Sequence, residues 1–427
     1  MVMESSFNEN DNLKPTMKNR NWLKIGLIAL VIVIAGAAGW YQLAGNTPLS
    51  ATEDKGAGLF PFLSMNKWGY MDSKGKVIIT PQFSNILAVP PYFSEGLAPV
   101  EVDNKWGYIN EKGDITIQPQ FEEAWLFQDG LAAVYIKTPS SKGSGYQRSV
   151  GYIDKTGQLV VQPQSSDTWN TYNTSLVRLG DSFGEVNNTG PYMARNPYEY
   201  ATDNEPRNFS DGLLRVQSDG QWGYMGKDGN IVIKPIYKDA LDFSEGKAAV
   251  RIEDKWGYID TNGVVVIKPQ YDKANVFSEG LAVFGRGDFD NDYYFRPWDQ
   301  DSDSDFRGGK WGFIKSDGTL LATPQFDGAK AFSEGLAAVK IEVNWGYIDK
   351  DLNMIIEPKY AQCLPFSEGR AAVCMNNKWG YIDAKGNEII KMQFDQAGEF
   401  ASGLAQVIRD ERRGYINTDG EVVRWDE

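Results

Sequence analysis

Four aspartates at alternate positions, Asp299, Asp301, Asp303 and Asp305, are the part of this sequence whose spacing most resembles a chemical site. Oxygen ligands at the first, third and fifth positions are how calcium-binding loops begin. However, no glycine follows at the sixth position, and Lys310 stands where such a loop carries its bidentate glutamate. A solvated acidic loop is therefore the better interpretation, and we predict no metal ion and no cofactor.

Aromatic side chains lie just before these acids, and together they suggest a ligand-binding loop. Flat apolar rings beside carboxylates, which accept hydrogen bonds from hydroxyl groups, suit a sugar ligand. The alternative is a loop that packs its own aromatic rings onto the rest of the protein. The candidate ligand-binding residues are Tyr293, Tyr294, Trp298, Asp299 and Asp301.

Residue usage excludes several kinds of catalysis. The chain has no histidine, which removes Ser-His-Asp and Cys-His chemistry and histidine-ligated zinc. Glycoside hydrolysis needs two acids held at a fixed separation. The acids here recur at the same turn position in successive copies of a repeat, as at Glu245, Glu279, Glu334 and Glu368. A residue that recurs in every copy has a structural role in the repeated unit, whereas catalysis needs one unique arrangement of residues. We therefore predict that the protein is not an enzyme.

Charge and cysteine content limit the partners. A formal net charge of −14 argues against nucleic acid, because phosphate binding needs clustered lysine and arginine. Cys363 aligns with alanines in other copies and is expected to fill a small buried slot, whereas Cys374 aligns with Lys340 and Arg251 and is expected to be more exposed. A disulfide between the two cysteines remains possible at this stage.

The elements that would position any site come from a repeated unit. A Trp-Gly pair marks each copy, and the distance from Trp222 to Trp256 gives a period of about 34 residues, within the range of repeat architectures. The pairs begin at Trp68, Trp106, Trp222, Trp256, Trp311, Trp345 and Trp379, and degenerate copies occur at Val150-Gly151 and Arg413-Gly414.

Each copy contains three runs typical of strands. In one copy these are Gly335 to Ile341, Trp345 to Asp349 and Met354 to Tyr360, rich in Val, Ile, Tyr and Trp and separated by turn residues. An Asp or Asn side chain can accept hydrogen bonds from amides two residues on, and glycine accepts positive φ, so Asp260 to Gly263 reads as a tight turn. The proline near the end of the third run indicates an edge, a strand end or a bulge.

One copy cannot bury its aromatic face alone, because an isolated two- or three-stranded piece is marginal in water. We therefore expect neighbouring copies to stack and share a core, with the repeated Trp, Tyr and Phe inside it. The glycine after each tryptophan is expected at a bulge or at a close approach of two backbones.

The motifs resemble those of the WG-repeat family, also called KWG repeats, which is found widely in bacteria. The resemblance rests on Lys67-Trp68-Gly69-Tyr70, Lys105-Trp106-Gly107-Tyr108-Ile109, Lys255-Trp256-Gly257-Tyr258-Ile259-Asp260 and Lys378-Trp379-Gly380-Tyr381-Ile382-Asp383, and on the Phe-Ser-Glu-Gly and Pro-Gln-Phe/Tyr signatures. It covers roughly residues 59 to 427. It implies an all-β array and a binding role, and it brings no catalytic motif.

The expected fold is all-β: a tandem WG-repeat array of small antiparallel three-stranded units, either an open curved solenoid or propeller-like. Units of about three strands and irregular insertions favour the open or incompletely closed form. The array is predicted over residues 59–427, with insertions at 138–149, 165–208 and 284–309.

The N-terminal part reads as a membrane anchor. Residues 22–43 supply about 20 apolar residues, enough to span the hydrocarbon core. Trp22 at one end and Trp40-Tyr41 at the other suit the two membrane–water interfaces. Basic residues lie on the N-terminal side of the span, and by the positive-inside rule this places the N-terminus in the cytoplasm. Residues 1–21 would be a disordered cytoplasmic tail and 44–58 a linker. The alternatives are a cleaved signal peptide, with Ala35-Gly36-Ala37 as the cleavage site, and a buried core helix.

These observations predict a single-pass protein of the bacterial cell membrane that displays a repeat array outside the cytoplasm. Its role would be binding or scaffolding, and its ligand an envelope protein or a glycan. Two alternatives stay open: a carbohydrate-active enzyme that uses acids of the insertions, and a purely structural spacer.

Overall fold

The computed structural model describes residues 58–84, 91–139, 146–162, 174–179, 182–189, 204–205, 208–218, 220–287 and 309–426, all within one compact unit, Gln42–Glu427. The predicted tail, the predicted membrane span and all of the predicted linker except Gly58 lie outside these residues. Across the described ranges, the structure contains no helix of the length and apolar character that a membrane span requires.

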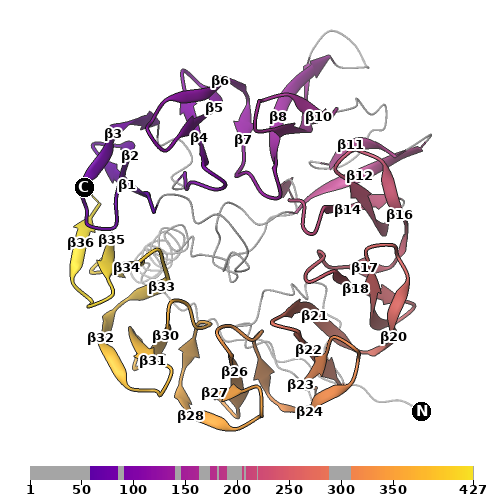
Figure 1. The fold of residues 1–427 in the computed structure, drawn as a ribbon, viewed down its shortest axis with the longest axis vertical. Helices are drawn as coiled ribbons and strands as arrows, with labels where there is room; N and C mark the ends of the chain where they lie inside the picture. Colours follow the sequence, from indigo (N-terminus) through magenta and orange to yellow (C-terminus); the bar gives the residue numbers. More distant parts are fainter. Residues whose placement is uncertain are drawn as a thin grey trace, which may run out of the picture. The chain divides into compact units, whose positions relative to one another are not determined.

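Nine small antiparallel sheets form the blades of a β-propeller, and Figure 1 shows them around a ring in chain order. The all-β repeat array predicted from the sequence is therefore confirmed, in its propeller form. Most blades have four strands, because a short inner strand precedes the three that the sequence pattern indicates.

The inner strands lie nearest the centre of the ring. Each follows the connection from the preceding blade and leads into the inner-to-second turn. They are β7 (Glu123–Ala124), β17 (Asp239–Ala240), β21 (Lys273–Ser278), β25 (Gly328–Ala329), β29 (Gln362–Cys363) and β33 (Gln396–Ala401). The second strands are β1 (Phe60–Ser64), β4 (Leu97–Val102), β8 (Leu131–Pro139), β14 (Leu213–Ser218), β18 (Lys247–Ile252), β22 (Leu281–Arg286), β26 (Leu336–Ile341), β30 (Arg370–Met375) and β34 (Leu404–Arg409).

The third strands carry the Trp-Gly pair or its degenerate form. They are β2 (Lys67–Met71), β5 (Lys105–Asn110), β9 (Tyr146–Asp154), β15 (Gln221–Gly226), β19 (Lys255–Asp260), β23 (Lys310–Lys315), β27 (Asn344–Asp349), β31 (Lys378–Asp383) and β35 (Arg412–Asn417).

The outer strands form the rim of the ring. They are β3 (Val77–Ser84), β6 (Ile115–Phe121), β10 (Leu159–Val161), β16 (Ile231–Tyr237), β20 (Val265–Tyr271), β24 (Leu320–Phe326), β28 (Met354–Tyr360), β32 (Glu388–Phe394) and β36 (Val422–Trp425). Three further strands, β11 (Thr174–Leu179), β12 (Ser182–Thr189) and β13 (Asn204–Glu205), join one blade through the pairing of β12 with β14.

The close approach expected at each Trp-Gly pair is present. A Cβ built on Gly346 would lie 2.4 Å from the carbonyl oxygen of Ile356, a distance that no side chain tolerates. The reason is a bulge in β28, where the pairing of Trp345 with Tyr360 jumps to Tyr347 with Ile356 and leaves Pro358 in the bulge of an edge strand.

The turn chemistry predicted from the sequence is also confirmed. In the turn between β27 and β28, Asp349 Oδ1 accepts hydrogen bonds from the amides of Asp351 (3.0 Å) and Asn353 (2.8 Å). In the preceding blade the glycine of this turn, Gly318, has φ of +83°, and its Cβ would lie 3.3 Å from Ile267 of the neighbouring blade. The same glycine thus serves both the turn and the packing between blades.

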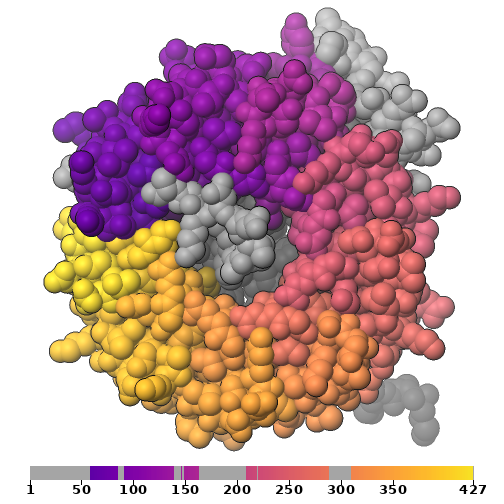
Figure 2. Space-filling model, viewed as in Figure 1, coloured from indigo at the N-terminus to yellow at the C-terminus, as the bar shows by residue number. Residues whose placement is uncertain are grey.

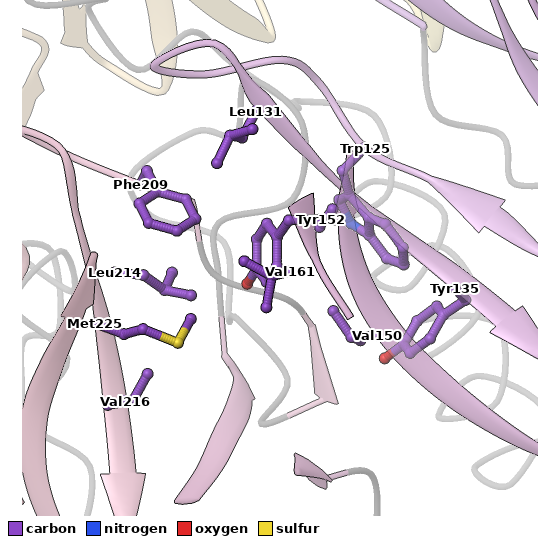
Figure 3. Packing of buried hydrophobic residues seen from close by; sticks show 11 residues of the cluster. Trp125, Leu131, Tyr135, Val150, Tyr152, Val161, Phe209, Leu214, Val216 and Met225 are labelled. Atoms are coloured by element: carbon purple, nitrogen blue, oxygen red, sulfur yellow. The ribbon is translucent and has the colours of Figure 1, made fainter. Parts of the chain in front are cut away.

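The core lies between neighbouring blades, as stacking of copies requires. One cluster joins Trp345, Tyr347 and Tyr360 to Phe366 and Val373 of the next blade. Figure 3 shows another, in which Tyr152 of one blade faces Phe209 and Leu214 of the next; the Tyr152 and Phe209 rings are 5.4 Å apart. The prediction that Trp345 is a core residue shared between copies is confirmed, since it is 3% exposed.

The ring is closed, which contradicts our preference for an open form. In Figure 2 the first blade (indigo) lies directly beside the last (yellow). Phe60, Phe62 and Met71 of the first blade pack against Leu404 and Tyr415 of the last. The sequence could not indicate this closure, because the contact joins the two copies that are farthest apart along the chain.

The degenerate copy at Arg413 is explained by this joint. The Arg413 guanidinium lies over the Trp68 ring, 5.1 Å from its centroid, and pairs with Asp426. Asp426 also accepts a hydrogen bond from the Leu63 amide at 3.1 Å. Arginine replaces the repeated tryptophan where the first and last blades meet.

The two cysteines are both free and both buried. Cys363 fills a buried slot as predicted, but the prediction that Cys374 is more exposed is wrong. Cys363 pairs with Val373 and Gln362 with Cys374 across β29 and β30. Because adjacent residues of a strand point to opposite faces, the two cysteine side chains lie on opposite faces of the sheet. This arrangement rules out the disulfide.

Candidate binding face

The ring has two faces, which the turns define. In an antiparallel blade, successive turns lie at opposite ends of the strands. The inner-to-second turns, such as Ser333–Leu336, and the third-to-outer turns, such as Asp349–Asn353, lie on one face, here the Ser-Glu-Gly face. The second-to-third turns and the connections to the next blade lie on the other.

Two of the three long interruptions of the repeat leave and rejoin the ring on that second face, which we name the insertion face. Residues 140–145 separate β8 from β9, and residues 288–308 follow β22 and precede β23. Residues 163–207 follow the outer strand β10 and precede β14, with β11, β12 and β13 among them. The first two therefore depart from and return to one side of the ring, whereas the third departs from that side and ends before β14, whose first residue lies on the Ser-Glu-Gly face.

The Ser-Glu-Gly face is occupied by a repeated contact between blades. Ser333 Oγ donates to the Phe366 carbonyl of the next blade at 2.7 Å, and Glu334 accepts from the Gly369 amide at 2.8 Å. Glu334 has φ of +52°, a strained backbone for a non-glycine residue that places its carboxylate at the neighbouring turn. The acids that recur at this position thus hold blade to blade, as their recurrence suggested. The same acid-to-amide contact joins Glu95 to Gly130, Asp129 to Gly212, Asp211 to Gly246, Glu245 to Gly280, Glu279 to Gly335 and Glu368 to Gly403.

The insertion face differs in its exposed apolar side chains. Met65, Tyr146 and Val343 are 89%, 75% and 72% exposed, and all three lie in second-to-third turns or at the start of a third strand. In the described part of the chain, every other strongly exposed large hydrophobic residue lies at the ring's rim, except Ile341, which precedes the Val343 turn, and Val264, which ends a third-to-outer turn of the Ser-Glu-Gly face. Exposed aromatic and apolar side chains on turns of a rigid scaffold are a common feature of recognition surfaces.

The candidate residues Tyr293, Tyr294, Trp298, Asp299 and Asp301 lie outside the described residues. The strands that flank them are described: Arg286 and Lys310 pair across β22 and β23. The Arg286 guanidinium donates to the Gln270 side chain at 3.2 Å and lies over the Tyr271 ring, 5.8 Å from its centroid.

The carboxylate of Asp272 supports the base of the same insertion. It accepts the Gly287 amide at 2.9 Å and pairs with Lys255. Burial opposes ionisation of Asp272, but the hydrogen bonds from Lys255 and Gly287 outweigh it and hold its pKa below the ordinary value. The stem from which residues 288–308 depart is therefore fixed to the preceding blade.

Sequence reasoning missed Met65, Tyr146 and Val343. A signal was available for two of them, because Met65 and Val343 occupy a two-residue turn that elsewhere holds polar residues. The comparable turns are Asp103-Asn104, Glu253-Asp254, Asn376-Asn377 and Asp410-Glu411. Comparison of the copies turn by turn would have found both. Within the described ranges, no three acids or cysteines gather closely enough to hold a metal ion.

Comparison with known proteins agrees with the repeat pattern. The family model described as WG containing repeat matches residues 68–106, 106–137, 151–179, 222–256, 256–288, 311–342, 345–379 and 379–411. No curated protein matches the chain at a significant level.

Among solved structures, a eukaryotic initiation factor is similar with 11% sequence identity, over 87% of this chain and 96% of that one, with a TM-score of 0.53. The Kluyveromyces lactis protein Hsv2p matches 79% of this chain and 96% of its own with 8% identity and a TM-score of 0.33. The first similarity supports the fold alone.

Proposed function

Because the chain belongs to the WG containing repeat family, we propose that it is a membrane-anchored binding or scaffold protein, with recognition on the insertion face of its propeller. The family and the propeller fold suggest a binding or scaffold role in general. One observation carries the finer proposal: the interruptions at 140–145 and 288–308 leave the ring on the face that also carries the exposed residues Met65, Tyr146 and Val343.

The two faces have different structural roles, and this difference supports the assignment of recognition to the insertion face. Side chains of the Ser-Glu-Gly face hold neighbouring blades together, so substitution there disturbs the ring. The insertions have no counterpart in other copies and can vary without loss of the scaffold. A rigid ring with irregular loops on one face is a common arrangement for recognition.

The place of Gly58, where the described chain begins, is compatible with this display. The described chain begins at Gly58, which precedes β1 on the Ser-Glu-Gly face, and its Cβ would lie 3.7 Å from Ser402 in a turn of that face. A tether that joins there leaves the insertion face free for a ligand. The proposed anchor is residues 22–43, with the N-terminus in the bacterial cytoplasm and the propeller outside it.

The proposed ligand is an envelope glycan or an envelope protein, bound without chemical conversion. The test uses the full-length protein and purified peptidoglycan in a co-sedimentation assay. Replacement of residues 287–309 by Asn-Asn copies the turn at Asn376-Asn377, so the ring should stay folded while binding falls. Tyr293→Ala and Trp298→Ala should reproduce part of the loss. Lys385→Ala, an exposed change on the opposite face, is the control.

Two results would contradict this proposal. Undiminished binding by the shortened protein would place recognition elsewhere on the ring. Turnover of the glycan that is abolished by Asp299→Asn or Asp301→Asn would make the protein an enzyme. The protein could instead fail to bind peptidoglycan but capture an envelope protein in a way that depends on residues 287–309. The insertion face would then still be the recognition surface, and the ligand would be a protein.

Membrane topology has its own test. A reporter fused after residue 58 should be active only outside the cytoplasm, and the protein should stay with the membrane fraction. Recovery of a mature chain that begins near residue 38 or 45 would replace the anchor by a secretion signal.

A further inference from the structure

The rim of the propeller is a row of edge strands. Each outer strand is the last in its sheet, so among the described residues its outward backbone groups have no strand partner. Unpaired N–H and C=O groups of an edge accept another extended chain, which natural proteins usually prevent with polar side chains and proline. Most outer strands of this ring expose some apolar residues, such as Ile78, Ile115 and Leu320, but follow the rule at two positions: the residue after the rim proline and the residue after the glycine of the preceding turn.

Two neighbouring blades carry an exposed apolar residue where the other blades have a polar one. Ile236 is 60% exposed at the position after the rim proline, where the other outer strands carry Gln or Lys. Val264 is 58% exposed directly after the glycine of its turn, where every other copy is polar. The residues equivalent to Ile236 are Gln82, Gln120, Gln164, Gln270, Gln325, Lys359 and Gln393, and those equivalent to Val264 are Lys76, Asp114, Gln158, Asn230, Thr319, Asn353, Asn387 and Glu421.

The two exceptions lie on neighbouring blades. Figure 1 shows β16 and β20 next to each other at the edge of the ring. A Cβ on Gly263, the residue before Val264, would lie 3.3 Å from Ile233 of β16, so the two strands are in contact through this turn. We name this surface the rim patch and define it as Val232, Lys234 and Ile236 of the β16 blade and Val264, Val265, Val266 and Lys268 of the β20 blade.

The patch is apolar and basic in an acidic protein. Val232, Val265 and Val266 are each more than two-fifths exposed. Lys234 and Lys268 are exposed between the apolar residues, and no acid of the described chain forms an ion pair with either. The equivalent positions elsewhere are Thr80, Gln118, Gln162, Thr323, Glu357 and Lys391, so two adjacent lysines occur only here along the rim.

We propose that the rim patch binds an extended, acidic and apolar segment of a partner protein, which adds a strand to the free edge of β20. The unpaired backbone selects an extended chain, and main-chain hydrogen bonds supply much of the affinity in this mode of binding. The valines select apolar side chains, and the two lysines select carboxylates. Because residues two apart on a strand lie on one face, as Val266 and Lys268 do on β20, the preferred segment carries an apolar and an acidic side chain two residues apart.

This site is separate from the insertion face. The rim lies on the side walls of the blades, whereas the insertions leave from the ends of the strands. A failure of the peptide test below therefore leaves the proposed role of residues 287–309 untouched, and the reverse also holds.

The test measures binding of a fluorescein-labelled nine-residue peptide, Val-Thr-Glu-Thr-Val-Thr-Glu-Thr-Val (the Val-Glu peptide), to the full-length protein by fluorescence anisotropy, because Val and Glu then share one face of the strand. The comparison peptides are the same sequence with Lys in place of Glu (the Val-Lys peptide) and a Val-Glu peptide N-methylated at alternate residues, which lacks the amide donors of one edge. The Val-Glu peptide should bind, and each comparison peptide should bind at least tenfold more weakly.

Variants that restore the pattern of the other copies give the sharpest check. Ile236→Gln together with Val264→Asn installs residues that the repeat already uses at these positions, so the fold is retained, and affinity for the Val-Glu peptide should fall at least tenfold. Leu320→Gln on β24 removes an equally exposed apolar residue outside the patch and should change nothing. Lys268→Glu should weaken Val-Glu binding and improve Val-Lys binding.

Several results would overturn the proposal. Equal affinity for the Val-Glu and Val-Lys peptides would exclude charge selection, and equal affinity for the N-methylated peptide would exclude strand addition. Unchanged affinity in the double variant would place the peptide elsewhere. If sedimentation velocity shows a dimer that the double variant abolishes, and no peptide binds, the occupant is a second copy of this chain.

Discussion

Arg413→Ala tests whether the ring is closed. Arg413 and Asp426 are 11% and 13% exposed, and the guanidinium covers the Trp68 ring of the first blade. Loss of one partner of a buried ion pair costs about 3–5 kcal/mol, because the other charge stays buried without compensation. Asp426 keeps the hydrogen bond from the Leu63 amide, which places the expected loss near the lower limit, about 3 kcal/mol.

The assay combines urea unfolding with hydrogen exchange of the full-length protein. Because the joint belongs to two blades, exchange should rise in both β1–β3 and β33–β36 and stay unchanged in blades on the far side of the ring, such as β17–β20. Asp426→Asn in the Arg413→Ala background removes the uncompensated charge and should recover about 1–2 kcal/mol of the loss.

Arg412→Ala is the matched control. Arg412 is the preceding residue, is exposed, and should change the free energy of unfolding by less than about 0.5 kcal/mol. The reasoning fails if Arg413→Ala behaves like this control. It also fails if exchange rises only in β33–β36, because the first blade would then not depend on the last.

Three further predictions concern the repeat. Trp345→Ala should cost about 3–5 kcal/mol, with loss of protection largest in β25–β28 and β29–β32; an even loss around the ring would contradict nearest-neighbour coupling. Tyr347→Phe removes the hydroxyl that donates to the Leu364 carbonyl of the next blade at 2.7 Å and should cost about 1 kcal/mol by urea unfolding, whereas Phe313→Tyr should gain a similar amount where the repeated tyrosine is missing. Hydrogen bonds from Asn387 hold the pKa of Asp383 below its ordinary value, and those from Asn353 do the same for Asp349. Since the folded pKa lies below the unfolded value of about 3.9, this stabilisation is complete above that pH and disappears as the pH falls through the folded pKa; the melting temperature should drop accordingly, and less steeply in Asp383→Asn.

Local features of the fold could be predicted because local chemistry determines them. The alternation of Val, Ile and Tyr indicates the three long strands. The Asp349 turn follows from the hydrogen bonds that its side chain accepts, and the bulge at Pro358 follows from the absence of a backbone N–H on proline. The inner strands were not predicted; four of the six, such as Asp239–Ala240, have two residues and are too short to show a period.

Closure of the ring and the rim patch depend on contacts between copies, so a single copy contains no sign of them. Arg413 looked degenerate because its partners Trp68 and Asp426 come from the opposite end of the array and from the end of the chain. Cys374 looked exposed because its counterparts are Lys340 and Arg251, whose long side chains can reach solvent from a position that buries a short thiol. The candidate residues from Tyr293 to Asp301 remain predictions from sequence.

The central claim is that recognition belongs to the insertion face. Hydrogen exchange of the full-length protein with and without soluble peptidoglycan fragments tests it most directly. We predict that slowed exchange is confined to the second-to-third turns, above all those of Met65 and Val343, and to the segments 140–145 and 288–308. Slowed exchange in the Ser-Glu-Gly turns, with the insertion face unchanged, would contradict the account.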